Sequence, residues 1–189
     1  MTDGPAAALP ASGRIIARTP RLILRTWTAA DVEPIAEVWS DAETMRHVGA
    51  VPRDRIPKAL AAGLEAQAQH GVCLWAVESP THGLIGDCGF HHRPDGLELG
   101  YHLVQRAWGQ GFATEAARAA IGYAIQHILD DAADAMGHAI LAWVHPDNPR
   151  SARVLDRLGF VGEGPDPAEE YELRYRLTRR RAMLAARPQ

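Results

Sequence analysis

The chain has 189 residues, of which 47% are hydrophobic and 23% are charged, and its formal net charge is −3. This length suits one folded domain with a real core, and the charge gives no electrostatic basis for binding nucleic acid. No apolar run approaches the length of a membrane span, and the N-terminus lacks the basic-then-apolar pattern of a secretory signal. We therefore expect a cytoplasmic protein that does not bind membranes.

The first thirteen residues differ from the rest. They are rich in Ala, Pro and Gly and show no period, so 1–13 is predicted to be a disordered leader. Residues 14–189 contain no linker and no repeat, which predicts a single domain.

The first half of this domain is predicted to contain strands and three helices. The sequence from Thr28 to Asp31 fits a capping box, and Pro57 and Gly71 are typical of the first turn and the end of a helix. The expected elements are a strand at 21–25, helices at about 28–39, 40–47 and 57–70, and strands at 72–78 and 84–92.

Residues 97–121 combine a strand, a glycine turn and a helix. Apolar residues alternate along 97–103, which indicates a strand with one buried face. The pattern breaks at Gly109-Gln110-Gly111, and an alanine-rich helical pattern runs from about Thr114 to Ile128. A helix N-terminus behind such a turn presents free N–H groups and a positive dipole end to an anion. Glycines let a diphosphate approach that backbone. The segment therefore predicts a phosphate-binding loop.

The spacing of the glycines restricts the kind of loop. A Rossmann fingerprint would need a third glycine where Thr114 stands, and no G-x-x-x-x-G-K-[ST] P-loop occurs. The pattern that fits is R-x-x-G-x-G, from Arg106 to Gly111.

The last part of the chain predicts more strands around one helix. Residues 139–144 are nearly all apolar, which suits a strand buried on both faces. A loop of turn formers follows at 145–151, and Ser151 is expected to cap a helix that runs to Leu158. Further strands are expected after Gly159 and at 171–177. Strands that first meander and then alternate with helices predict an α+β fold with a mixed sheet.

No metal site and no disulfide are expected. Cys73 and Cys88 fall on separate predicted strands and are interpreted as small buried hydrophobic residues of a cytoplasmic protein. The histidines and cysteines lack C-x-x-C or H-x₃-H spacing, which metal sites favour.

Three stretches together resemble one family. They are TPRLILRTWTAADVEPIAEVWSDAETMRHVG, ELGYHLVQRAWGQGFATEAARAAIGYA and HPDNPRSARVLDRLGF, in this order within residues 19–160. They resemble the RimJ/RimL-like branch of the GNAT superfamily of N-acetyltransferases. The resemblance implies a mixed, mostly antiparallel sheet of about seven strands, flanked by helices, whose fourth and fifth strands splay apart.

The resemblance also implies acetyl-CoA as co-substrate, with its pantothenate arm in the splayed notch and its pyrophosphate on the glycine loop. The implied cofactor-binding residues are Leu103, Val104, Arg106, Gly109, Gln110, Gly111, Phe112, Ala113, Thr114, Asn148, Ser151 and Arg153; Arg150 is an alternative to Arg153 near the phosphates.

The implied reaction is direct attack of a primary amine on the acetyl thioester in a ternary complex. The amine belongs to a protein N-terminus or a small molecule, and relatives often dimerise, so a homodimer is one expected assembly. The tyrosine that many GNAT enzymes carry seven residues after the loop asparagine is replaced here by Leu155. The candidate catalytic residues are therefore Glu98, near the amine, and Ser151, near the sulfur.

Several alternatives stay open at this point. Glu98 could be only an exposed strand residue, with His102, His91, His92 or water accepting the proton. The whole domain could instead be a non-catalytic acyl-CoA-binding or regulatory module, or a binder of nucleotide phosphates.

Overall fold

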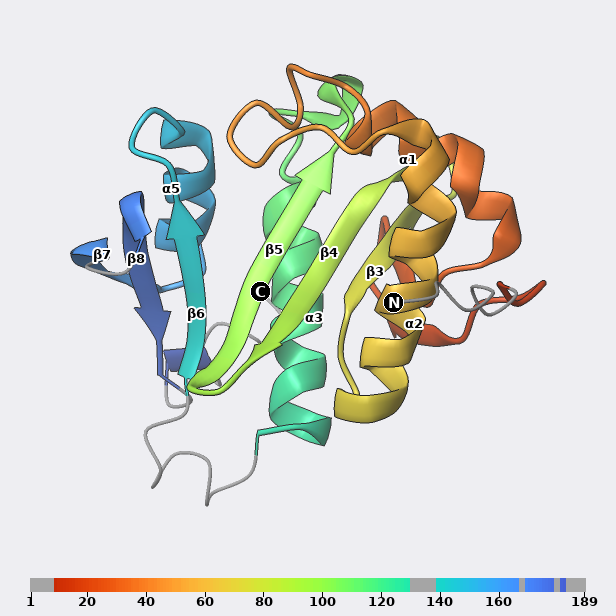
Figure 1. Ribbon diagram of the computed structural model, residues 1–189. Coiled ribbons are helices and arrows are strands. Elements are labelled where there is room, and N and C mark those ends of the chain that lie inside the picture. Colours follow the sequence, from red (N-terminus) through yellow and green to blue (C-terminus); the bar gives the residue numbers. More distant parts are fainter. Residues whose placement is uncertain (1–8, 130–138, 167–168, 179–180, 183–189) are drawn as a thin grey trace, which may run out of the picture.

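The centre of the computed structural model, which describes residues 9–129, 139–166, 169–178 and 181–182, is an open sheet of eight strands (Figure 1). Their order across the sheet is β1-β2-β3-β4-β5-β6-β8-β7. Neighbouring strands are antiparallel except β5 and β6, which run parallel. The strands are β1 (Ile15–Arg18), β2 (Ile23–Arg25), β3 (Leu74–Ser79), β4 (Gly83–Arg93), β5 (Gly96–Leu103), β6 (Ala139–Val144), β7 (Val161–Asp166) and β8 (Glu169–Leu177).

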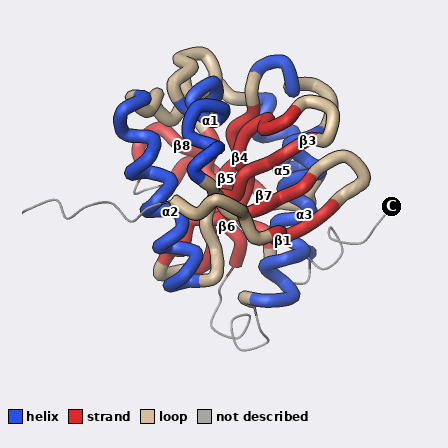
Figure 2. The backbone as a smooth tube through the Cα atoms, turned by 90° about the vertical axis from the view of Figure 1, so that its right-hand side faces the viewer, coloured by secondary structure: helices blue, strands red, loops and turns tan. Residues whose placement is uncertain are grey.

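Helices cover both faces of the sheet (Figure 2). The first face carries α1 (Val32–Trp39) and α2 (Ile56–His70), and the second carries α3 (Phe112–His127) and α5 (Pro149–Arg157). The helices turn apolar sides to the strands, and α3 does so with buried alanines that permit a close approach. Burial of this apolar surface is the main source of stability.

The parallel contact between β5 and β6 is short, and it determines where the site lies. Residues 96–98 pair with 139–141, and there the pairing ends. Farther along, β5 stays paired with β4 and β6 with β8, so β5 and β6 diverge (Figure 1). The facing backbone edges of 99–103 and 142–144 are left for another partner. The predicted α+β class with a mixed, mostly antiparallel and splayed sheet is confirmed.

The sheet has eight strands where about seven were expected, because the short β1, which was not expected, pairs with β2. With β1 counted, the strands that splay apart are β5 and β6 rather than the fourth and fifth. One helix prediction is wrong. Residues 40–47 form turns rather than a helix. The Asp41 carboxylate accepts from the Thr44 N–H (2.8 Å) and hydroxyl (2.6 Å), and such local bonds compete with helix formation.

Other predicted boundaries agree with the structure. Thr28 and Asp31 form the expected capping box, and α2 ends at Gly71 in the left-handed conformation (φ 76°). Cys73 and Cys88 are free and buried. Residues 1–8, most of the leader expected at 1–13, lie outside the described residues. Within the described end of that stretch, the carbonyl of Pro10 accepts from the Ala29 N–H (3.0 Å). Within the described ranges, no helix has the length and apolar character to cross a membrane.

Candidate active site

A cavity of about 880 Å³ lies where β5 and β6 diverge. It reaches from the segment 43–51, which follows α1, to the N-terminal ends of α3 and α5, and thus connects both faces of the sheet. Of the residues singled out from the sequence, it is lined by His91, Glu98, His102, Leu103, Gly109, Gly111, Phe112, Ala113, Thr114, Asn148, Arg150, Ser151 and Arg153.

The predicted phosphate loop has the backbone geometry that its glycines suggest. Gly109 (φ 75°) and Gly111 (φ 81°) are both left-handed, a conformation that glycine adopts without strain. A Cβ atom at Gly109 would meet nothing within 4 Å, so this position favours glycine because of its positive φ and not because a side chain would clash. Gly111 directly precedes Phe112, where α3 begins. The unpaired N–H groups of the first helical turn therefore open beside the loop.

Thr114 adds a donor to this loop. Its hydroxyl is buried and, within the part of the chain that the structure describes, has no hydrogen-bond partner. A buried hydroxyl left without a partner costs stability, and a ligand oxygen would remove that cost. Thr114 lines the cavity in the first turn of α3. The residues of the loop thus fit a diphosphate.

Arg21 holds the loop from outside the cavity. Its guanidinium donates to the carbonyl of Gln110 (3.0 Å) and to the carboxylate of Glu115 (2.6 Å), which also accepts from Thr19 (2.6 Å). Burial would raise the pKa of Glu115, but the bonds from Thr19 and Arg21 lower it overall. Glu115, in the first turn of α3, is therefore an ionised carboxylate whose charge is balanced by Arg21, beside the predicted phosphate loop.

Three predicted cofactor contacts do not line the cavity. Val104 is buried in the core. Arg106 is ion-paired with Glu37 of α1 (3.0 Å), and Gln110 donates to the carbonyl of Arg106 (2.7 Å). These side chains support the turn, and their contact with a cofactor remains a prediction.

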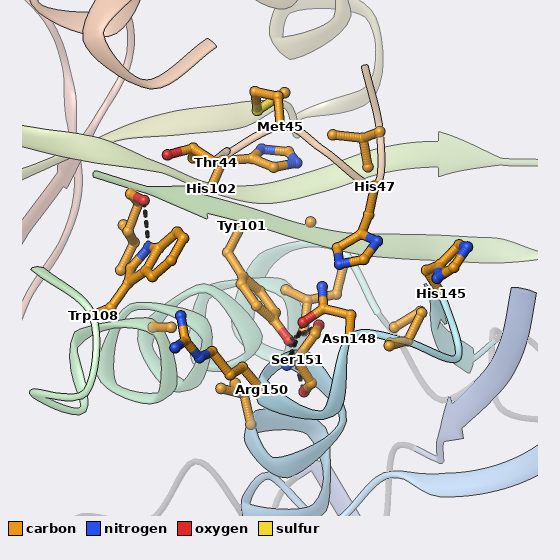
Figure 3. A pocket seen from close by; sticks show the side chains of 18 of the residues that line it. Thr44, Met45, His47, Tyr101, His102, Trp108, His145, Asn148, Arg150 and Ser151 are labelled. Carbon is orange, nitrogen blue, oxygen red and sulfur yellow. Dashed lines mark hydrogen bonds between the residues drawn. The ribbon is translucent and has the colours of Figure 1, made fainter. Parts of the chain in front are cut away.

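The start of α5 corrects one expectation. The helix begins at Pro149, and Asn148 rather than Ser151 is its N-cap, because the Asn148 side chain accepts from the Ser151 N–H (3.2 Å). The Ser151 hydroxyl is instead 2.7 Å from that of Tyr101, which also donates to the Ser151 carbonyl (3.2 Å) (Figure 3). Burial raises the pKa of Tyr101, although the bond to Ser151 lowers it, so the phenol stays protonated at neutral pH.

Two histidines and a glutamate lie near the base of the splay. Glu98 lines the cavity with a side chain 25% exposed, and Arg93 lies 3.3 Å from its carboxylate. His91 lines the same cavity, whereas the ring of His92 stacks on that of His70 at 4.2 Å.

His102 belongs to a buried hydrogen-bonded group. Its Nδ1 is 2.9 Å from the carboxylate of Asp87, which is fully buried, and the other oxygen of Asp87 accepts from Trp39 Nε1 (2.6 Å). Burial lowers the pKa of His102, but the charge of Asp87 and its bond raise it overall, above the ordinary value. Figure 3 places His102 beside Thr44, on the opposite side of β5 from Tyr101.

Tyr101 and Asp87 were not singled out from the sequence. Tyr101 was counted only as an apolar strand residue, although a tyrosine hydroxyl on a buried face needs a partner. Asp87 interrupts the apolar run from Ile85 to Phe90, and a carboxylate inside a buried strand must be paired. That signal could have found it.

Comparisons with known proteins agree with this geometry. The family model of the acetyltransferase (GNAT) domain matches residues 21–161. The chain is 34% identical to the uncharacterised N-acetyltransferase YoaA of Bacillus subtilis (strain 168), across 79% of this chain and 84% of that protein.

Two solved structures share the fold. The acetyltransferase (GNAT family) from Bacillus anthracis has a TM-score of 0.71 at 22% identity, covering 88% of this chain and 99% of that one. RimL, the ribosomal L7/L12 alpha-N-protein acetyltransferase in complex with coenzyme A, has a TM-score of 0.65 at 13% identity, covering 87% of this chain and 98% of that one.

The splayed mixed sheet lies within a domain that the acetyltransferase model matches, and its fold is shared with a solved acetyltransferase. The chain belongs to the GNAT family, and it is an N-acetyltransferase enzyme. This membership does not favour a non-catalytic binding module. Across the described residues no group of three or more His, Cys, Asp or Glu side chains is arranged to hold a metal ion.

Proposed function

We propose that this enzyme transfers the acetyl group of acetyl-CoA to a primary amine, on a small molecule or a peptide N-terminus, in a ternary complex. One observation carries the proposal: a single cavity connects the phosphate loop on one face of the sheet with a polar acceptor side on the other. The coenzyme A in the RimL structure is in keeping with this use of the fold.

Residues around the cavity would hold the diphosphate and the pantetheine arm of acetyl-CoA. The first-turn N–H groups of α3 and the Thr114 hydroxyl would hold the diphosphate. Arg153 and Arg150 line the cavity from α5 and would face the phosphates. The free edge of 99–103 would pair with the amides of the pantetheine arm. Once bound, acetyl-CoA supplies a thioester carbonyl as the electrophile.

The hydroxyls of Ser151 and Tyr101 would serve the leaving sulfur. They are 2.7 Å apart, at the start of α5 and on β5, respectively. Because Tyr101 stays protonated and donates to the Ser151 carbonyl, its oxygen can accept from the Ser151 hydroxyl and hold it in place. We propose that the Ser151 hydroxyl turns to donate a hydrogen bond to the developing thiolate. This replaces the tyrosine that is absent at Leu155.

Glu98 would hold the ammonium group of the acceptor before transfer. It lies in the cavity on the same strand as His102, where the pairing of β5 with β6 ends. The RimJ/RimL-like branch belongs to this proposal, supported by Asn148 and Ser151 and by the fold of RimL. A cytoplasmic location and a homodimer remain predictions.

The test is an activity screen. Purified protein is incubated with acetyl-CoA and a panel of amino acids, polyamines, antibiotics with primary amines and N-terminal peptides, and free thiol release is measured. We expect at least one amine to raise thiol release well above the rate without acceptor, with the acetylated amine seen by mass spectrometry. Equal release with and without every amine would contradict the proposal.

A further inference from the structure

We propose that His102 is the general base of the reaction and that Asp87 and Trp39 are its positioning residues. The inference rests on the proposed function, because it names the group that accepts the proton of the acceptor amine. The observation behind it is the hydrogen-bonded row Trp39–Asp87–His102, which ends in the cavity.

The geometry fixes which nitrogen of His102 is available. Asp87 and His102 face each other directly across β4 and β5, so the short carboxylate reaches Nδ1. A carboxylate accepts only, and therefore the neutral imidazole keeps its proton on Nδ1. Nε2 is then the nitrogen with a free lone pair. The side chain is 20% exposed and lines the cavity, which gives Nε2 access to an acceptor amine.

The surroundings of Asp87 suit it to hold the His102 ring in one orientation. It is fully buried, and its second oxygen is occupied by the indole N–H of Trp39, which can only donate. A buried carboxylate with two fixed donors cannot rotate away from His102. The arrangement holds the tautomer and stabilises the imidazolium that forms on proton transfer.

Glu98 is less suited to accept the proton. Arg93 lies 3.3 Å from its carboxylate and shares its charge. The other titratable groups that line the cavity are Glu43, which is bonded to Arg46, His47, which stacks on His145, His91 of β4 and Glu172 of β8. Tyr101 also lines it, but on the opposite side of β5, where it is bonded to Ser151.

The proton balance is simple. The amine nitrogen forms a bond to the thioester carbonyl carbon, and the carbon–sulfur bond breaks with its electron pair left on sulfur. The bound ammonium first gives one proton to His102 Nε2, which passes it to solvent, so that a neutral amine attacks. The nitrogen loses its second proton when the amide forms, and this proton balances the one that the sulfur takes through the hydroxyl pair or water. No oxidant or metal is required.

The first arm of the test is long-range ¹H–¹⁵N NMR of the imidazoles, which needs no acceptor. The His102 signals are assigned by their loss in His102→Gln and His102→Asn. We expect neutral His102 to carry its proton on Nδ1 and to titrate above the ordinary value. In Asp87→Asn the amide oxygen must face Trp39, so its NH₂ faces Nδ1, and the proton should move to Nε2. A wild-type proton on Nε2, or an unchanged tautomer in Asp87→Asn, would overturn the inference.

The second arm uses the acceptor found in the activity screen. We expect His102→Gln and Asp87→Asn to lower kcat/KM at neutral pH by roughly 10²- to 10⁴-fold. Part of the loss in His102→Gln should return at high pH, where the amine is already neutral. Coenzyme A affinity should stay unchanged, which shows that the variants fold. His92→Gln, an exposed histidine outside the cavity, is the matched control.

Different results would contradict the proposed function and the proposed role of His102. Absence of any acceptor contradicts the proposed function while the NMR arm still tests the tautomer. Wild-type kcat/KM and pH profile in His102→Gln would leave the acetyltransferase intact and remove His102 as its base.

Discussion

Asn148 and Ser151 lie three residues apart at the start of α5 and have separate tasks. Asn148 caps the helix with its side-chain oxygen, while the Ser151 hydroxyl is turned to Tyr101. Stability and catalysis can therefore be separated at this turn by single substitutions.

Asn148→Ala should lower the free energy of unfolding by about 1 kcal/mol, because the first turn loses its cap. Ser151→Ala should change stability little and lower kcat by roughly 10- to 10³-fold, since in the proposed mechanism its hydroxyl acts in the transition state. Denaturant unfolding and steady-state kinetics measure the two effects. If Ser151→Ala lost stability as Asn148→Ala does and kept its kcat, Ser151 would be purely structural.

The Asp87–His102 pair makes stability depend on pH. The folded pKa of His102 is raised above its unfolded value, which is about 6.5. Its charge therefore stabilises the fold fully below about pH 6.5, and this contribution is lost as pH rises through the folded pKa. The stability difference between wild type and His102→Gln should shrink from pH 5.5 to pH 9, as measured by urea unfolding. A difference that grew with pH would show that the imidazole is buried neutral.

These residues mark the limit of what a sequence allows. Glu98 and His102 could be placed on one strand face by alternation alone. The partner of His102 could not, because Asp87 is 15 residues away and faces it only through the register of β4 against β5. The bond between Tyr101 and Ser151 likewise depends on how α5 packs beside β5.

At the scale of elements, the sequence predicted turns and boundaries correctly where a single local effect determines the backbone conformation. The glycine loop and Gly71 were predicted because left-handed backbone favours glycine. The helix predicted at 40–47 was wrong because the hydrogen bonds that Thr44 donates to the Asp41 side chain outweigh a weak helical pattern. β1 was missed because four residues carry little period, and its pairing with β2 is a tertiary effect.

We propose that the loop and α3 act as one anion-binding element. Gly111→Val should weaken coenzyme A binding strongly, because the branched side chain disfavours a φ of 81° and the first-turn N–H groups shift. Gly83→Val is a matched control, since Gly83 (φ 66°) is the first residue of β4 and lies outside the cavity. Calorimetric titration gives both affinities. Equal affinities in two folded variants would remove the loop as the diphosphate site.

The segment before β2 supports the same element. Arg21→Ala should free the Glu115 carboxylate beside the anion site and release the Gln110 carbonyl. We expect coenzyme A affinity to fall roughly 5- to 30-fold, equivalent to about 1–2 kcal/mol, as for charges at a helix terminus. Arg53→Ala is the control, because its ion pair with Glu33 is exposed and neither residue lines the cavity. If Arg21→Ala bound coenzyme A as tightly as the control does, the bonds of Arg21 to Glu115 and Gln110 would play no part in binding.

At the scale of the whole molecule, the decisive feature is the short strand pairing between two parts of the sheet, β1 to β5 and β6 to β8. β6, β7 and β8 pair with the larger part through residues 96–98 and 139–141. The cavity uses residues from both parts, including Thr114 and Ser151. A ligand that fills the gap must therefore bridge them, and its binding energy adds to the stability of the fold.

This bridging predicts a thermal shift with a definite location. Coenzyme A at 100 times its Kd should stabilise the protein by about 2.7 kcal/mol, which raises Tm by roughly 5 to 11 °C for a domain of this size. Hydrogen exchange should slow most at 99–103, at 142–144 and in the first turn of α3, where free N–H groups meet the ligand. ATP offers phosphates but no pantetheine arm, so it should give a smaller shift and protect only the loop. If ATP matched coenzyme A in both the shift and the protected residues, the gap between β5 and β6 would not be the binding site, and binding of nucleotide phosphates would be the better reading of the loop.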